Sequence, residues 1–200
     1  MSHDTGIHPM ITMENFILKI DDALSDDLCD LCINYYDDKR AQSYDDPHNY
    51  VQAYEMEIKD GVIMSKLNES FFRIVNFYMS RFRTFRCQYD SGITLRKIFG
   101  PTKEHTDGVV SSTPTPLSQI GERMSSLIIG LNSDYEEGVF NFPLQGCQTR
   151  VERGQAILFP PFWTHPHEVS APVNGFRYTL NTWLVQDMYL PFIPKGTHES

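Results

Sequence analysis

The pattern of apolar and polar positions changes character near residue 90. Before that point apolar residues recur at helical spacing, and beyond it they gather in short runs that are typical of strands. From Gly61 to about Phe85 the apolar positions fall on one helical face, which predicts a long helix that backs a sheet. An earlier helix is predicted after Ser25, because Ser25, Asp26 and Asp27 suit an N-cap and an acidic first turn.

Five apolar runs beyond residue 90 predict β-strands separated by turn residues. The runs are Ile93–Phe99, Ser125–Leu131, Val139–Phe142, Gln155–Phe159 and Phe176–Val185. A further strand is predicted from Asn15 to Ile20, and the Asn174-Gly175 pair predicts a tight hairpin. Helices followed by many short strands predict a mainly β protein of the α+β class with a sandwich or jelly-roll core.

Length and composition predict one domain spanning residues 1–200. The chain is long enough for one sizeable core, and its 40% share of hydrophobic residues is typical of a soluble globular protein. We expect residues 1–89 to form a strand and helical support layer, and residues 90–190 to form the β-core. The Ser-, Thr- and Pro-rich stretch from Gly108 to Gly121 is long for a connection, and two interpretations stay open: a surface insertion or a substrate lid.

Charge and cysteine content narrow the class of protein. A formal net charge of −9 argues against binding along a nucleic-acid backbone, which depends on Lys and Arg. Neither a membrane span nor a secretion signal is predicted, since the apolar runs are short and the N-terminus lacks a basic start. Cys29 and Cys32 have no second pair to complete a zinc site, so they are predicted to be core thiols of a cytoplasmic protein. Oligomeric state is not predicted.

His105 and Asp107 form the first candidate for a metal site. On extended backbone, residues two positions apart point to the same side, so an imidazole and a carboxylate can bind one ion together. Two histidines and one carboxylate leave coordination positions open on Fe(II), which suits oxygen chemistry. A second, distant histidine is therefore required, and both His165 and His167 are candidates because they follow a predicted buried strand.

Arg177 is the candidate for an anion-binding residue. Strand alternation places it on one face with Thr179, Asn181 and Trp183, which predicts a guanidinium and an indole directed into the interior of the β-core. A buried arginine needs an anionic partner, and its planar fork matches a carboxylate.

In order and spacing, several motifs in the second half of the chain resemble the Fe(II)- and 2-oxoglutarate-dependent dioxygenases, in particular their prolyl 4-hydroxylase-like branch. The motifs are His105-x-Asp107, Leu131-Asn132, Glu137-Gly138-Val139-Phe140, Leu158-Phe159-Pro160, His167-Glu168-Val169, Gly175-x-Arg177-Tyr178 and Trp183. The resemblance covers about half the chain. It implies a double-stranded β-helix, which is a jelly-roll core.

The resemblance also implies roles for individual residues. His105, Asp107 and His167 would bind the iron, and choosing His167 keeps the interval to Arg177 that the family has. Arg177 would bind the distal carboxylate of 2-oxoglutarate. Ser126 and Trp183 would line the co-substrate pocket. Lys97 and Phe99 are nearest to the position where relatives carry a tyrosine that holds the co-substrate, and Lys97 is the candidate for that contact.

The activity implied is hydroxylation that consumes O2 and 2-oxoglutarate and releases succinate and CO2, with ascorbate as a possible reductant. The expected substrate is a peptidyl proline or a related amino-acid-like molecule, because Trp183 stands where nucleic-acid demethylases of the superfamily have a second arginine. Two alternatives stay open: a non-catalytic jelly-roll sensor or binding protein that keeps a metal site, and a zinc hydrolase.

Overall fold

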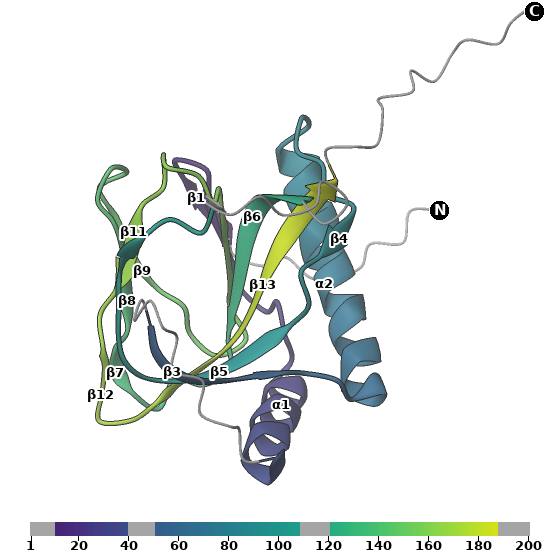
Figure 1. The fold of residues 1–200 in the computed structure, drawn as a ribbon, viewed down its shortest axis with the longest axis vertical. Helices are drawn as coiled ribbons and strands as arrows, with labels where there is room; N and C mark the ends of the chain where they lie inside the picture. The colour runs from purple at the N-terminus through teal and green to yellow at the C-terminus, as the bar shows by residue number, and fades with distance from the viewer. Residues whose placement is uncertain (1–10, 40–50, 109–120, 188–200) are drawn as a thin grey trace, which may run out of the picture.

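The computed structural model describes residues 11–39, 51–108 and 121–187, and it shows two helices and a curled antiparallel sheet (Figure 1). Helix α1 spans Asp26–Lys39 and helix α2 spans Gly61–Arg81. The strands before residue 108 are β1 (Ile11–Glu14), β2 (Ile17–Ile20), β3 (Val51–Glu57), β4 (Tyr89–Asp90) and β5 (Thr94–His105). Those after residue 120 are β6 (Gly121–Gly130), β7 (Glu136–Glu137), β8 (Val139–Phe142), β9 (Cys147–Arg150), β10 (Ala156–Phe159), β11 (His167–Val169), β12 (Pro172–Val173) and β13 (Arg177–Asp187).

The main sheet runs in the order β1-β2-β10-β6-β13-β5-β11-β8-β9, with β3 added to β5 and β4 added to β13. It curls so that β8, β9 and β11 come to face β6 and β13 across an interior (Figure 1). The mainly β prediction and the jelly-roll core are therefore confirmed. None of the helices in the described ranges is long and apolar enough to cross a lipid bilayer.

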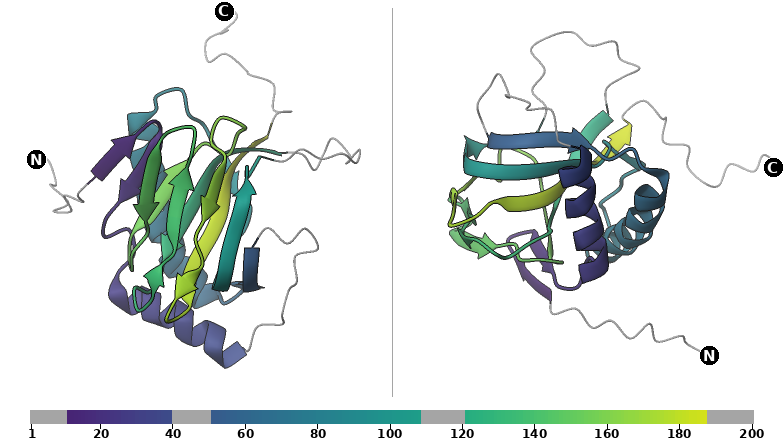
Figure 2. Two further views of the ribbon diagram at one scale, coloured as in Figure 1. Left: turned by 90° about the vertical axis from the view of Figure 1, so that its left-hand side faces the viewer. Right: turned by 90° about the horizontal axis from the view of Figure 1, so that it is seen from below.

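Strand alternation divides the apolar residues into two cores on opposite faces of the sheet. On β10, Ala156 and Leu158 pack in the core shared with the helices, whereas Ile157 and Phe159 pack in the core inside the curl. The continuous apolar run of β10 is explained by this burial on both faces. Helices α1 and α2 lie side by side outside the sheet (Figure 2).

Two local predictions are corrected by the structure. The predicted strand from Asn15 is shorter, because Asn15 and Phe16 have positive φ angles (48° and 69°) and form the turn of the β1–β2 hairpin. The Asn174-Gly175 pair does reverse the chain, but it makes no hairpin, since β12 pairs with β7 and β13 pairs with β5, β6 and β4. Most of the predicted lid or insertion, residues 109–120, lies outside the described residues.

Candidate metal centre

Pairing of β5 with β11 places His105 directly opposite His167. The two imidazole centroids are 4.4 Å apart. Asp107 follows β5 by two residues, and its carboxylate oxygens lie 3.2 Å from His105 Nε2 and 3.8 Å from His167 Nε2. The strand register thus brings together two histidines and an aspartate that are widely separated in the sequence.

Backbone carbonyls fix both imidazole rings through their Nδ1 atoms. The oxygen of Lys103 lies 2.8 Å from His105 Nδ1, and the oxygen of His165 lies 3.2 Å from His167 Nδ1. A carbonyl oxygen can only accept, so each Nδ1 carries the hydrogen when the ring is neutral. Nε2 of each ring is then the basic nitrogen that faces Asp107, as a metal ligand must be.

Three contacts hold Asp107 in place. Ser126 on β6 donates its hydroxyl hydrogen to Oδ2 at 2.5 Å, and Arg123 Nη1 donates to the backbone oxygen of Asp107 at 2.7 Å. The next residue, Gly108, donates its N–H to the oxygen of Pro161 at 2.7 Å. The carboxylate therefore has a defined orientation between the two imidazoles.

Electrostatic interactions within the cluster favour an ionised Asp107 carboxylate beside the imidazoles of His105 and His167. Burial alone would raise the pKa of Asp107, but the hydrogen bond with His105 and the charges of both histidines hold that pKa well below its usual range. Burial lowers the pKa of His167, which favours the neutral imidazole. Burial also acts to lower the pKa of His105, yet the hydrogen bond and charge of Asp107 outweigh it, and the pKa is raised.

The donor set fits a divalent transition metal. One ligand atom from each of His105, Asp107 and His167 lies within 4.8 Å of the others. Two neutral imidazoles and a carboxylate on one side of an ion leave its other side open, which is the arrangement of non-haem Fe(II) oxygenases. Oriented Nδ1 atoms and the hydroxyl bound to Asp107 are the outer-shell contacts that such sites use.

Replacing Ser126 by alanine tests whether its hydrogen bond to Asp107 supports metal binding. We expect Ser126→Ala to weaken Fe(II) binding by about 10- to 100-fold, because the carboxylate loses the hydrogen bond that orients it. Equilibrium dialysis against Fe(II) under anaerobic conditions measures the change. Ser125→Ala is the matched control, since Ser125 is also buried on β6 but donates to backbone oxygens. Equal affinities in Ser126→Ala and the wild type would contradict the proposed role.

A cavity inside the curled sheet extends from the three ligands to Arg177. Its space, including the part open to solvent, is about 440 Å³, and Ile98, Phe140, Asn181 and Trp183 are among the residues that line it. Arg177 is only 3% exposed, and its Nε and Nη1 atoms have no hydrogen-bond partner in the described structure. Burial lowers the pKa of Arg177 to about 10. The cavity therefore contains a cationic side chain with N–H donors that lack an acceptor.

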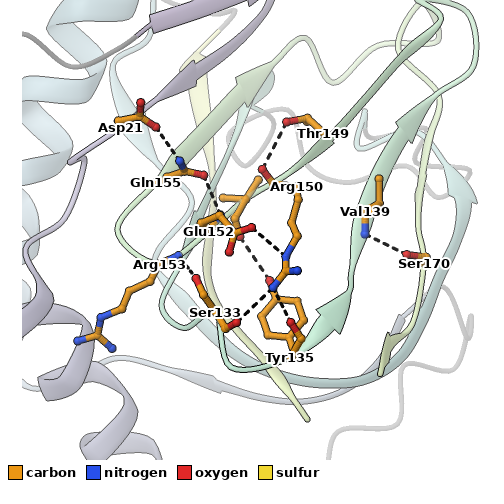
Figure 3. Close-up of polar contacts among 11 residues, drawn as sticks. Asp21, Ser133, Tyr135, Val139, Thr149, Arg150, Glu152, Arg153, Gln155 and Ser170 are labelled. Carbon is orange, nitrogen blue, oxygen red and sulfur yellow. Dashed lines mark hydrogen bonds and ion pairs between the residues drawn. The ribbon is translucent and has the colours of Figure 1, made fainter. Parts of the chain in front are cut away.

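Residues on the segment before β8 position the Arg177 side chain. Gly138 has a φ angle of +69°, and a Cβ atom there would lie 2.7 Å from the Tyr135 ring and 3.3 Å from Arg177 Cδ. Tyr135 is held in turn by Arg150, whose guanidinium lies 4.4 Å from the ring centroid and donates to the oxygen of Tyr135 (Figure 3). Glycine is needed at position 138 for both reasons.

The structure brings most predicted site residues together. His105, Asp107, Ser126, His167, Arg177 and Trp183 all line the cavity. His165 is directed elsewhere, because its Nε2 lies 3.0 Å from the oxygen of Asn15 in the β1–β2 turn. Lys97 does not reach the cavity: it lies on the outer face of β5, with its Nζ 4.5 Å from the ring centroid of Phe176. The predicted contact between Lys97 and the co-substrate is therefore corrected.

Two arginines near the site were not predicted from the sequence. Arg96, next to Lys97 on β5, lines the cavity. Arg123 lies with its guanidinium carbon 3.5 Å from the Trp183 ring centroid. Alternation along β5 was the available signal for Arg96, because residue 96 shares a face with Ile98 and residue 97 does not.

Comparison with solved structures finds prolyl hydroxylases. The viral collagen prolyl hydroxylase of Paramecium bursaria Chlorella virus-1, in complex with 2-oxoglutarate, matches at 18% identity and a TM-score of 0.69, over 86% of this chain and 96% of that one. A Trichoplax adhaerens prolyl hydroxylase, in complex with a hypoxia inducible factor peptide fragment, matches at 15% identity and a TM-score of 0.63, over 86% and 84% of the two chains. A Pseudomonas putida prolyl-4-hydroxylase matches at 14% identity and a TM-score of 0.65, over 86% and 92%.

At these identities the likeness concerns the fold, and this chain has the fold of prolyl 4-hydroxylase-like oxygenases. No family model matches the sequence. No curated protein matches it either.

Proposed function

We propose that this chain, which has the prolyl hydroxylase fold, is an Fe(II)- and 2-oxoglutarate-dependent hydroxylase. Its substrate would be a peptidyl proline or a related amino-acid-like molecule, and its products would include succinate and CO2. The observation that carries the proposal is the buried Arg177, which lacks a partner for two of its nitrogens and shares one cavity with the His-Asp-His group. A structural metal site alone would give no reason for this arginine.

The three ligand residues and Arg177 would each have a part in this chemistry. Fe(II) bound by His105, Asp107 and His167 would couple oxidation of 2-oxoglutarate by O2 to insertion of one oxygen atom into a substrate C–H bond, the other oxygen entering succinate. Arg177 would bind the distal carboxylate of the co-substrate, because its planar fork can donate two parallel hydrogen bonds. Burial of Arg177 excludes water from that contact and so strengthens it.

Ser126 and Trp183 would complete the co-substrate pocket. Ser126 lies directly opposite Trp183 in the β6–β13 pairing, so both side chains stand at the same level of the cavity. Ser126 donates a hydrogen bond to Asp107. Trp183 stacks against Arg123 and lines the cavity. Such residues keep a co-substrate in position and limit the entry of solvent.

Succinate production tests the proposal. The purified protein is incubated with Fe(II), ascorbate and 2-oxoglutarate, with and without proline-containing peptides and free amino acids. We expect succinate that depends on Fe(II) and rises with a suitable substrate. A protein that binds Fe(II) and 2-oxoglutarate yet makes no succinate with any substrate would instead be a non-catalytic binding protein. Hydrolytic activity supported by Zn²⁺ would favour the hydrolase alternative.

A further inference from the structure

Arg96 lines the cavity and forms an ion pair with Glu55, and neither residue has a part in the chemistry above. Glu55 on β3 stands directly opposite Arg96 on β5 in the strand register, so both side chains are on the cavity face of the sheet. Arg96 lines the cavity, and Glu55 Oε1 lies 2.5 Å from its Nε. Their side chains are only 20% and 19% exposed, which distinguishes this pair from the solvated Lys59–Glu57 pair nearby.

The pair keeps unused hydrogen-bonding capacity. Arg96 Nε is fully buried against Glu55, so the exposed part of the side chain lies elsewhere. Within the described ranges, Nη1 and Nη2 of Arg96 donate to no residue, and Oε2 of Glu55 accepts from none. A half-buried ion pair of this kind is costly to keep unless a further partner satisfies its remaining donors and acceptors.

The negative charge of Glu55 limits the kind of ligand that the Glu55–Arg96 pair can bind. Arg96 lies close enough to Arg177 for its charge to help burial lower the pKa of Arg177. The carboxylate of Glu55 offsets that second positive charge, and it would repel a ligand that carries only negative charge. In the proposed function, moreover, 2-oxoglutarate already uses one carboxylate at the metal and the other at Arg177. The pair is therefore suited to a ligand that is itself both cation and anion.

We propose that Glu55 and Arg96 bind the charged α-carbon groups of a free amino acid, which is the primary substrate. The Nη atoms of Arg96 would donate to the substrate carboxylate, and Glu55 would accept from its ammonium group. An α-amino acid has the two charges on groups bonded to one carbon, so their separation is comparable to that within the pair. A peptidyl proline inside a chain has neither charge and would leave the pair unsatisfied.

The position of the pair suits such a substrate. The cavity that Arg96 lines also contains His105 and His167, so an amino acid bound by its α-carbon groups can extend its side chain toward the metal ligands. This inference rests on the proposed function and narrows its substrate class from peptidyl or free amino acids to free ones. The metal and Arg177 would act as described above.

Blocked and unblocked substrates give the first test. The twenty common L-amino acids are each added to the wild type with Fe(II), ascorbate and 2-oxoglutarate, and succinate is measured. For L-proline and any other amino acid that raises succinate, the N-acetyl derivative and the amide are compared. We expect stimulation by a free amino acid and at least a tenfold smaller response to each blocked form. Stimulation by blocked forms or by capped proline peptides alone would overturn the inference.

Variants of the pair give the second test. Arg96→Leu and the exchange Glu55→Arg with Arg96→Glu should each raise the KM for the amino acid by about 10- to 100-fold, as expected for losing charged hydrogen bonds. The exchange keeps a cross-strand ion pair, so a purely structural pair would leave its KM unchanged and overturn the inference. Glu57→Gln, on the same strand but at the solvated pair, is the matched control.

Binding separates failure of this inference from failure of the proposed function. Calorimetric titration of the same amino acids into Zn²⁺-loaded protein with 2-oxoglutarate requires no turnover. Binding that is lost in Arg96→Leu, without succinate from any mixture, would support the amino-acid site and contradict the hydroxylase. Succinate without binding or stimulation by any free amino acid would support the hydroxylase and overturn the amino-acid site.

Discussion

Asp107→Ala and His167→Ala are each expected to abolish Fe(II) binding and succinate formation together. Both residues offer ligand atoms at the cluster, and only three such atoms come from the described residues. Loss of one ligand should reduce turnover by well over 100-fold, since losing an outer-shell contact already costs about 10- to 100-fold. Anaerobic equilibrium dialysis and a succinate assay on the same preparations measure the two effects.

The control for these variants is Glu168→Ala. Glu168 adjoins His167 on β11 but is exposed and accepts a hydrogen bond from Asn141. We expect Glu168→Ala to bind iron and form succinate as the wild type does. His165→Ala tests which of the two histidines that the sequence offered, His165 or His167, is the metal ligand. Retained iron in His167→Ala together with lost iron in His165→Ala would transfer the ligand role to His165.

Arg177→Met is expected to have opposite effects on activity and on stability. The KM for 2-oxoglutarate should rise by about 100-fold or more, because two charged hydrogen bonds to the distal carboxylate are lost. The free energy of unfolding without co-substrate should increase by about 1–3 kcal/mol, because methionine removes buried N–H groups that have no partner. Thermal unfolding and steady-state kinetics measure both effects.

Co-substrate addition provides the internal control for Arg177. We expect 2-oxoglutarate, with metal present, to raise the Tm of the wild type but not that of Arg177→Met, because only a ligand that binds the folded state stabilises it. Arg177→Lys keeps the charge without the planar fork and should have an intermediate KM. A lower Tm with an unchanged KM in Arg177→Met would make Arg177 a structural residue.

The sequence predicted the elements that local patterns specify. The helical face from residue 61 onward and the apolar run of β10 both occur as predicted, because amphipathic spacing and burial on two faces leave direct signals. The spacing of His105 and Asp107 made them a candidate pair for one metal ion, and the structure places both in one cluster with His167. These signals depend on residues that are near one another in the chain.

Features that depend on distant partners were not predictable in the same way. Asn174-Gly175 specifies a chain reversal but not the partner of the strands beside it, and Gly175 packs closely on Asp134 and Tyr135 instead of closing a hairpin. Alternation places Arg96 and Lys97 on opposite faces of β5, but which face lines the cavity depends on the distant strands that pair with β5. Arg123 acquires its place only through contacts with Asp107 and Trp183.

The pairing of β5 with β11 has a consequence for folding kinetics. His105 and His167 come together only after this long-range strand pairing has formed. Such pairings form slowly, because the loss of chain entropy on closing a long loop comes before the stabilising contacts are made. We therefore expect the metal to bind the native chain but not early folding intermediates. Added metal should then slow unfolding while leaving the folding rate nearly unchanged.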